Sequence, residues 1–131
     1  MRVIINTDGG SRGNPGPAAI GGVITDDAGG ELVTVSETIG ITTNNVAEYT
    51  AVIRTLEAAL DLGATEVTLR ADSELLIRQL EGRYKVKAAH LRPLVDEIKE
   101  LLARFDRVEL EHVRRGSNTR ADELVNQALD A

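Results

Sequence analysis

The chain has 131 residues, a length that suits one ordinary domain with a hydrophobic core. It contains no Cys, which excludes disulfides, thiolate zinc sites and cysteine nucleophiles, and this fits a reducing compartment. The formal net charge of −6 argues against a uniformly basic surface, although Lys and Arg gather over residues 78–92 and again at Arg114, Arg115 and Arg120.

The first part of the chain is predicted to form three strands. A β-branched run over residues 2–8 indicates a strand, and residues 9–17 are so rich in Gly, Asn and Pro that we expect a wide turn there. The apolar or β-branched segments 18–25 and 31–39 flank Asp26-Asp27-Ala28-Gly29-Gly30, which is typical of a β-hairpin. The three strands are therefore expected to form an antiparallel meander.

The rest of the chain alternates helices and strands. Thr43, Asn44 and Asn45 are capping residues, and helical periodicity follows as far as Leu62, before Gly63. We then expect strands over 66–71 and 107–113 and helices over 73–80, 90–105 and 117–129. This order predicts a single α/β domain spanning residues 1–131, a mixed sheet with helices on its faces.

The N-terminal residues do not resemble a targeting segment. Met1 and Arg2 lead into the strand-like Val3-Ile4-Ile5, and no apolar stretch is long enough to cross a bilayer. We expect a cytoplasmic protein with no membrane partner.

Four acidic residues occupy positions that make them candidate site residues. On a helical wheel Glu48 shares the apolar face of its helix, where an ionised carboxylate is costly unless it is paired or bound to a cation. Asp8 ends the first strand and Asp72 the fourth, so they meet if those strands are neighbours. Asp122 lies at the margin of an apolar helical stripe. Each has an ordinary alternative: a half-solvated helix-start Glu, a turn former, an N-cap and an exposed helix acid.

Taken together, the four acids are more informative than any one of them. Clustered carboxylates repel and raise each other's pKa unless a divalent metal neutralises them. Oxygen ligands suit Mg²⁺ or Mn²⁺, and two such ions about 4 Å apart can promote phosphodiester hydrolysis.

The ordered motifs resemble those of type 1 ribonuclease H over essentially the whole chain. They are Thr7-Asp8-Gly9-Gly10-Ser11-Arg12-Gly13-Asn14-Pro15-Gly16-Pro17, Thr42-Thr43-Asn44-Asn45-Val46-Ala47-Glu48, Asp72-Ser73 and Asn118-Thr119-Arg120-Ala121-Asp122. The resemblance implies a five-stranded mixed sheet, three antiparallel strands followed by parallel additions, with helices on both faces. It further implies an endonuclease that cuts the RNA strand of RNA/DNA hybrids, leaves 5′-phosphate products and serves replication and repair.

By this resemblance Asp8, Glu48, Asp72 and Asp122 are the catalytic acids and hold two Mg²⁺ ions, with Mn²⁺ as a possible substitute. The resemblance also implies that Thr43 contacts a phosphate of the DNA strand and that polar groups near the first loop reach the RNA 2′-hydroxyls. The expected substrate contacts are Gly10, Ser11, Arg12, Asn14, Thr43, Asn44, Asn45, Arg78, Lys85, Lys87 and Arg115. Capping by Asn44 or Asn45, and a solvated loop over residues 82–87, are the simpler alternatives.

The chain departs from the family pattern at two places. Many members carry a basic, Trp-rich protrusion, whereas residues 82–87 are short, keep only positive charge and contain no Trp. Many members also have a loop His, but here residues 113–118 contain none and His112 comes too early. We therefore interpret His112 as structural and expect Arg115 or Arg120 to handle phosphate. Short bacterial and archaeal members have a similar shortened, arginine-containing loop, so the change is compatible with activity. In a further departure, Glu74 and Arg78 stand where other members of the family often carry amide side chains.

Two other functions remain open at this stage. The missing loop His and Trp-rich protrusion would also suit a binding module that keeps the hybrid groove without useful catalysis. The same two-metal chemistry could instead act on DNA junctions or double-stranded RNA, since a fold alone does not decide the substrate. We expect a monomer that requires no protein partner.

Overall fold

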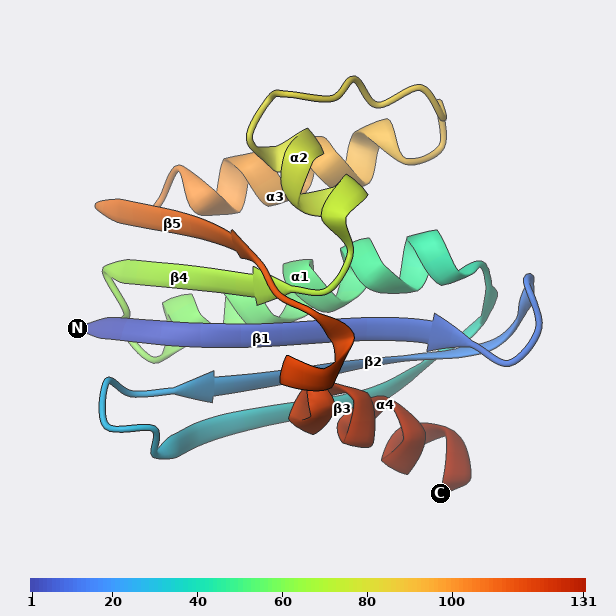
Figure 1. The fold of residues 1–131 in the computed structure, drawn as a ribbon, viewed down its shortest axis with the longest axis horizontal. Coiled ribbons are helices and arrows are strands. Elements are labelled where there is room, and N and C mark those ends of the chain that lie inside the picture. The colour runs from blue at the N-terminus through green and yellow to red at the C-terminus, as the bar shows by residue number, and fades with distance from the viewer.

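The computed structural model describes residues Met1–Ala131 and contains one five-stranded sheet in the order β3-β2-β1-β4-β5 (Figure 1). The strands are β1 (Arg2–Ser11), β2 (Gly16–Thr25), β3 (Glu31–Thr42), β4 (Glu66–Ala71) and β5 (Arg107–His112). β1, β2 and β3 pair antiparallel, and β4 and β5 are added in parallel to β1. The expected mixed sheet is confirmed.

Four α-helices accompany the sheet. They are α1 (Asn44–Asp61), α2 (Glu74–Leu80), α3 (Arg92–Leu102) and α4 (Thr119–Asp130), and a short 3₁₀ turn, η1 (Arg115–Ser117), precedes α4. No helix combines the length and apolar character that a membrane span requires.

The first strand is longer than expected. β1 pairs with β4 only as far as Thr7, but its pairing with β2 continues through Asp8 to Ser11, which lies opposite Ala18. The Gly-rich segment predicted as a turn is thus partly strand, because backbone hydrogen bonding to β2 outweighs the turn preference of its residues. Asp8 lies within the strand, at the point where one neighbouring strand has ended.

The helices cover both faces of the sheet. A Cβ built on Gly21 would stand 2.2 Å from the Ala121 carbonyl oxygen of α4, whereas one built on the next residue, Gly22, would stand 2.0 Å from the Thr55 hydroxyl of α1. Because successive residues of a strand point to opposite faces, α1 and α4 lie on opposite sides of β2. Figure 1 shows α4 in front of the sheet and α1 behind it.

The main hydrophobic core lies between the sheet and α1, α2 and α3. Val3, Ile5 and Leu69 of the sheet are 0% exposed, as are Leu56 of α1 and Ile98 of α3. Buried aliphatic area of this kind stabilises at roughly 25 cal/mol per Å². α4 is the only helix on the other face, so its position depends on fewer apolar contacts.

Two helices have sharper limits than the sequence indicated. Thr43 is the N-cap of α1, its hydroxyl accepting a hydrogen bond from the Val46 amide at 3.3 Å, and Gly63 follows the helix with φ +87°. α3 is shorter than the predicted 90–105, because Leu91 is its N-cap and the chain leaves the helix at Ala103.

Candidate active site

The four candidate carboxylates come from four different elements. In the parallel pair β1 and β4, Thr7 lies opposite Ala71, so Asp8 and Asp72 are the next residues of two adjacent strands. The condition under which Asp8 and Asp72 are expected from the sequence to meet, that their strands are neighbours, is therefore fulfilled. Glu48 belongs to the second turn of α1 and Asp122 to the first turn of α4.

These carboxylates line a single open cleft. Its volume is about 450 Å³ and its wall is mostly polar. The lining consists of Asp8, Gly9, Gly10, Ser11, Arg12, Asn44, Glu48, Asp72, Arg115, Asp122, Val125, Asn126 and Leu129. Helix ends from both faces of the sheet thus meet strand ends in one hollow.

Asp8 is the most strongly perturbed acid of the cleft. Burial, followed by the negative charges of Asp72 and Asp122, raises the pKa of Asp8 from 3.8 to about 7. A hydrogen bond with the Asp122 side chain also raises this pKa, and the Gly9 backbone amide partly opposes the rise. Asp72 and Asp122 are therefore close enough to Asp8 for their charges to act on it.

Glu48 is perturbed in the same direction. Burial raises its pKa from 4.5 to about 7, the Ser73 hydroxyl lowers it by donating a hydrogen bond, and the Asp72 charge raises it. The helical wheel placed Glu48 on the apolar face of its helix, and this burial agrees with that expectation. Ser73 also caps α2, accepting a hydrogen bond from the Leu76 amide at 3.3 Å. One hydroxyl thus serves both the helix start and the carboxylate.

The donor set fits a hard divalent cation. All four acidic groups offer oxygen, and two of them have pKa values raised to about 7, as expected where negative charge is not compensated. As the side chains stand in this structure, no group of three or more acidic or imidazole residues is arranged so that it could hold a metal ion. The carboxylates line a cleft open to solvent, which leaves space for water and for a substrate phosphate.

Amide and hydroxyl groups form the wall beside the acids. The Asn44 side-chain oxygen accepts hydrogen bonds from the Ser11 amide at 2.8 Å and from the Ser11 hydroxyl at 3.1 Å. The Asn14 side-chain oxygen accepts one from the Asn44 amide at 3.1 Å. Thr43, not Asn44 or Asn45, caps α1, so the Asn44 side chain instead ties β1 to the start of α1.

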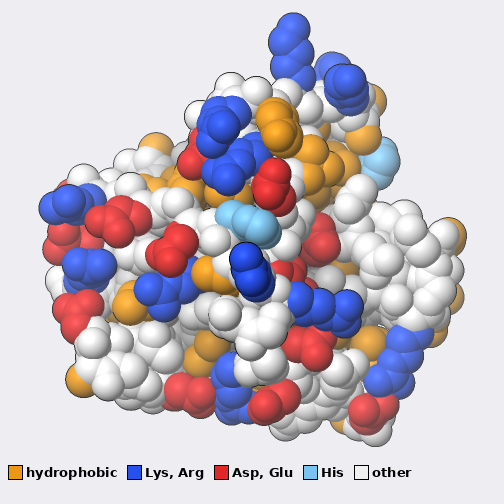
Figure 2. Space-filling model, in the orientation of Figure 1, with side chains coloured by type: hydrophobic (Ala, Val, Ile, Leu, Met, Phe, Trp, Pro, Cys, Tyr) orange, Lys and Arg blue, Asp and Glu red, His pale blue; other side chains and the backbone are white.

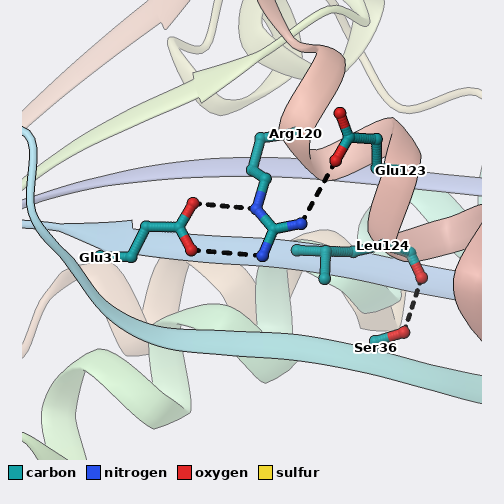
Figure 3. Close-up of polar contacts among 5 residues, drawn as sticks. All are labelled: Glu31, Ser36, Arg120, Glu123 and Leu124. Carbon is teal, nitrogen blue, oxygen red and sulfur yellow. Dashed lines mark hydrogen bonds and ion pairs between the residues drawn. The ribbon is translucent and has the colours of Figure 1, made fainter.

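The two arginines expected near the phosphate lie in different surroundings. Arg115 lines the cleft. The guanidinium of Arg120 is instead paired with Glu31 at 2.9 Å and with Glu123 at 3.3 Å (Figure 3), and Arg120 does not line the cleft. Arg12 lines the cleft as expected and also pairs with Asp130 at 2.7 Å. Of the two alternatives, only Arg115 lines the cleft.

A second groove of about 530 Å³ adjoins the first at the start of α1, where Asn44 lines the acidic cleft and Asn45 lines the groove. Its lining consists of Asn45, Leu75, Gln79, Arg83, Tyr84, Lys85, Lys87, Ala88 and Leu91. Figure 2 shows Lys and Arg side chains gathered at the top of the molecule, over α2 and the segment after it. We refer to this groove as the basic groove.

Two other expected residues lie outside both hollows. Arg78 pairs with Glu81 at 2.8 Å and lines neither the acidic cleft nor the basic groove. His112 ends β5 and its Nδ1 lies 3.7 Å from the Glu74 carboxylate, in keeping with a structural role.

Sequence reasoning did not single out Asn118 as a site residue. It is 2% exposed, and its side-chain amide donates to the Thr7 carbonyl at 2.9 Å while its side-chain oxygen accepts from the Asn6 amide group at 3.1 Å. Its own backbone carbonyl accepts from the Asp122 amide. Asn118 thus connects the strand of Asp8 with the helix of Asp122; its place in the last quoted motif was the only available signal.

Comparison with known proteins relates the whole chain to nucleases. A family model described as "Reverse transcriptase-like" matches residues 6–128. The chain is 47% identical over 132 residues to the bifunctional protein Rv2228c of Mycobacterium tuberculosis and 47% identical over 129 residues to ribonuclease HI of Halobacterium salinarum. The two matches include 100% and 98% of this chain, but only 36% and 65% of the lengths of the two relatives.

A solved structure agrees with this similarity. LC11-RNase H1, solved in complex with an RNA/DNA hybrid, superposes with a TM-score of 0.92 and 50% identity over 98% of this chain and 96% of that one. Proteins of this family generally depend on divalent metal. Because sequence similarity and fold similarity agree along nearly the whole chain, it belongs to the ribonuclease H family, in its short type 1 form.

Proposed function

We propose that this protein is an endonuclease that hydrolyses the RNA strand of RNA/DNA hybrids, leaves 5′-phosphate products and removes RNA from hybrids in replication and repair. The observation that carries the proposal is the meeting of Asp8, Glu48, Asp72 and Asp122 in one open cleft. Burial and mutual repulsion raise the pKa values of Asp8 and Glu48 to about 7. Such a cluster is costly alone and useful when it binds cations.

The four carboxylates are proposed to hold two Mg²⁺ ions, with Mn²⁺ as the alternative. When bound, the ions supply charge neutralisation at the phosphate and acidify water. The chain's own contribution is to hold the carboxylates on rigid elements. Asp8 lies on β1, Asp72 directly follows the adjacent parallel strand β4, and the Ser73 hydroxyl lowers the pKa of Glu48.

The polar wall of the cleft is proposed to recognise the RNA strand. Ser11, Asn14 and Asn44 are already linked by hydrogen bonds, so their side chains are held in place before a substrate binds. Gly10 and Arg12 line the same wall, and Arg115 lines the cleft near the acids. Short polar groups beside glycine allow a wide minor groove to come close, where 2′-hydroxyls are exposed.

The DNA strand is proposed to lie along the basic groove. Asn44 and Asn45 are consecutive, yet one lines the acidic cleft and the other the basic groove, so a duplex crossing the start of α1 meets both. Thr43 lies at the same helix start, and its hydroxyl, which accepts from the Val46 amide, still has a proton to donate to phosphate. Lys85 and Lys87 supply positive charge. Arg78, engaged with Glu81, contributes at most to the field around this groove.

The decisive test compares three matched duplexes. A hybrid, a DNA duplex and an RNA duplex of one sequence are incubated with the protein, with and without Mg²⁺ or Mn²⁺, and the ends of the products are identified. We expect metal-dependent cutting of the hybrid RNA strand alone. Preferred cutting of duplex DNA would remove the 2′-hydroxyl argument, and cutting of duplex RNA would favour the second substrate class. Tight hybrid binding without product would indicate a binding module.

The Asp8→Asn variant tests the site itself. Hybrid cleavage is expected to fall by at least about a thousandfold, since an essential ligand is lost. Asp61→Asn, which changes an exposed acid at the end of α1, is the matched control and should cleave like the wild type. Wild-type cleavage by Asp8→Asn in the presence of metal would refute the assignment.

The protein is further proposed to act as a monomer in the cytoplasm. One chain supplies all four acids and both hollows, so catalysis needs no second subunit. The absence of Cys suits a reducing compartment. Sedimentation of the protein with and without hybrid tests whether it is a monomer.

A further inference from the structure

A row of three residues crosses the sheet beneath α4. Asp8 of β1 lies opposite Gly21 of β2, and Gly21 lies opposite Ser36 of β3. Residues paired directly across neighbouring strands share a face, so this row points toward α4. We call Asp8, Gly21 and Ser36 the cross-sheet row.

Each member of the cross-sheet row meets α4 in a different way. Asp8 and Asp122 of α4 line the same cleft and lie close enough for their charges to interact. Gly21 lets the helix approach so closely that a Cβ there would stand 2.2 Å from the Ala121 carbonyl oxygen. The Ser36 hydroxyl donates to the Leu124 carbonyl at 2.6 Å (Figure 3).

A second tie joins the same edge of the sheet to α4. Arg120, in the first turn of α4, forms a two-pronged ion pair with Glu31, the first residue of β3, at 2.9 and 3.2 Å (Figure 3). Its remaining amino group reaches Glu123 at 3.3 Å. Arg120 and Leu124 are four residues apart and share one side of the helix, which both contacts hold against β3.

These two ties limit rotation of α4 about its axis. Asp122 is two residues from Arg120, which places it about 200° around the helix, on the side away from β3. Gly21 has no side chain that could pack between residues of α4. The close approach of α4 to Gly21 therefore does not by itself fix the rotation of the helix. Any turn of α4 that moved Asp122 away from Asp8 would break the Ser36 and Glu31 contacts.

We propose that Ser36, together with the Glu31–Arg120 pair, positions Asp122: it holds α4 in the rotation that directs Asp122 toward Asp8. Ser36 lies across the sheet from the acids and takes no part in the chemistry itself. This inference rests on the proposed function, in which Asp122 helps to hold divalent cations.

The test measures metal binding directly as well as cleavage. Titration of the hybrid-free protein with MnCl₂ in a calorimeter is compared for wild type, Ser36→Ala and Glu31→Gln. Each variant is expected to bind Mn²⁺ about tenfold more weakly, the size seen when supports of metal ligands are removed. Amide hydrogen exchange over residues 120–125 should become faster, while the KM for hybrid stays unchanged.

Thr34→Ala is the matched control. Thr34 lies two residues before Ser36 on the same face of β3, is exposed, and forms no side-chain hydrogen bond to α4. It should bind Mn²⁺ and exchange its α4 amides like the wild type. Melting curves of all variants show whether any loss merely follows a lower stability.

A second background separates positioning from general damage. If Ser36 acts through Asp122, then Ser36→Ala should not weaken Mn²⁺ binding further in an Asp122→Asn protein. An equal loss in both backgrounds, or a Ser36→Ala variant that matches Thr34→Ala, would overturn the inference. Failure of the proposed function looks different, because the wild-type protein itself would then show no metal-dependent cleavage of the hybrid RNA strand.

Discussion

Asn118 donates a 2.9 Å hydrogen bond to the carbonyl of Thr7, so the start of α4 is fastened to the residue just before Asp8. Asn118 is 2% exposed, and its loss would leave the buried Thr7 carbonyl and the Asn6 amide group without this partner. We expect Asn118→Ala to lower the free energy of unfolding by about 1–3 kcal/mol. Cleavage should fall as well, because the Asn118 side chain fastens the start of α4 to β1, and Asp122 lies in the first turn of α4.

Chemical denaturation and hybrid cleavage of Asn118→Ala measure both effects. Gln127→Ala, which changes an exposed polar residue of the same helix, is the control and should change neither. An Asn118→Ala protein as stable as this control would show that the link between β1 and α4 is dispensable.

The metal-free protein should lose stability as pH rises. An acid whose pKa is higher in the folded state keeps its proton there while the unfolded chain releases its own, so stability falls with pH between the two values. For Asp8 this window runs from 3.8 to about 7, and for Glu48 from 4.5 to about 7. Because both groups are partly solvated, we expect a loss of about 2–4 kcal/mol for the two together.

Melting in the presence of EDTA at several pH values tests this expectation. Other titrating groups also change with pH, so Asp8→Asn is compared with the wild type at each pH. The variant should gain relative stability from pH 4 to 7, and above pH 7 added Mg²⁺ should restore stability to the wild type alone. A constant difference between the two proteins would contradict the pKa shift of Asp8.

Substitution by Ala is expected to destabilise the protein at Gly9 but to have little effect on stability at Gly10. A Cβ on Gly9 would stand 2.2 Å from the backbone of Ala47 in α1, whereas the nearest atoms to one on Gly10 are 3.9 Å away. Gly9→Ala is therefore expected to cost about 3 kcal/mol, through displacement of the helix that carries Glu48. Gly10→Ala should stay within about 1 kcal/mol of the wild type. Thermal unfolding of the two variants decides, and equal stability would show that α1 moves freely.

Lys85 and Lys87 should set part of the salt dependence of hybrid binding. If both meet phosphates, replacing each with Gln lowers the slope of log affinity against log salt by about 1. The rate at saturating hybrid should stay unchanged, since the basic groove is separate from the acids. Arg54→Gln on the exposed side of α1 is the control. An unchanged slope in the lysine variants would indicate a solvated segment.

The element order was predictable because periodicity reports which face of each segment is buried. The prediction failed where strand pairing, and not the local sequence, determines the structure. Residues 9–11 consist of Gly and Ser and were predicted as turn, yet they extend β1 because β2 continues beside them. No local pattern contains that information.

The candidate site was predictable to a similar depth. Asp8 and Asp72 could be brought together from topology alone, because they follow adjacent parallel strands. The placement of α4 could not, since it depends on Gly21, Ser36 and Asn118, which are far from Asp122 in sequence. For the same reason only the structure could separate Arg115, in the cleft, from Arg120, paired with Glu31.

The division of the four acids among β1, β4 and helices on opposite faces has a consequence for the folding chain. A chain that has completed its sheet and α1 but has not yet docked α4 carries three of the acids and lacks the fourth at the cleft. The complete set of four acids therefore forms only when α4 is docked on the sheet. In the proposed enzyme, a molecule whose α4 is not docked would lack one of its metal-binding carboxylates.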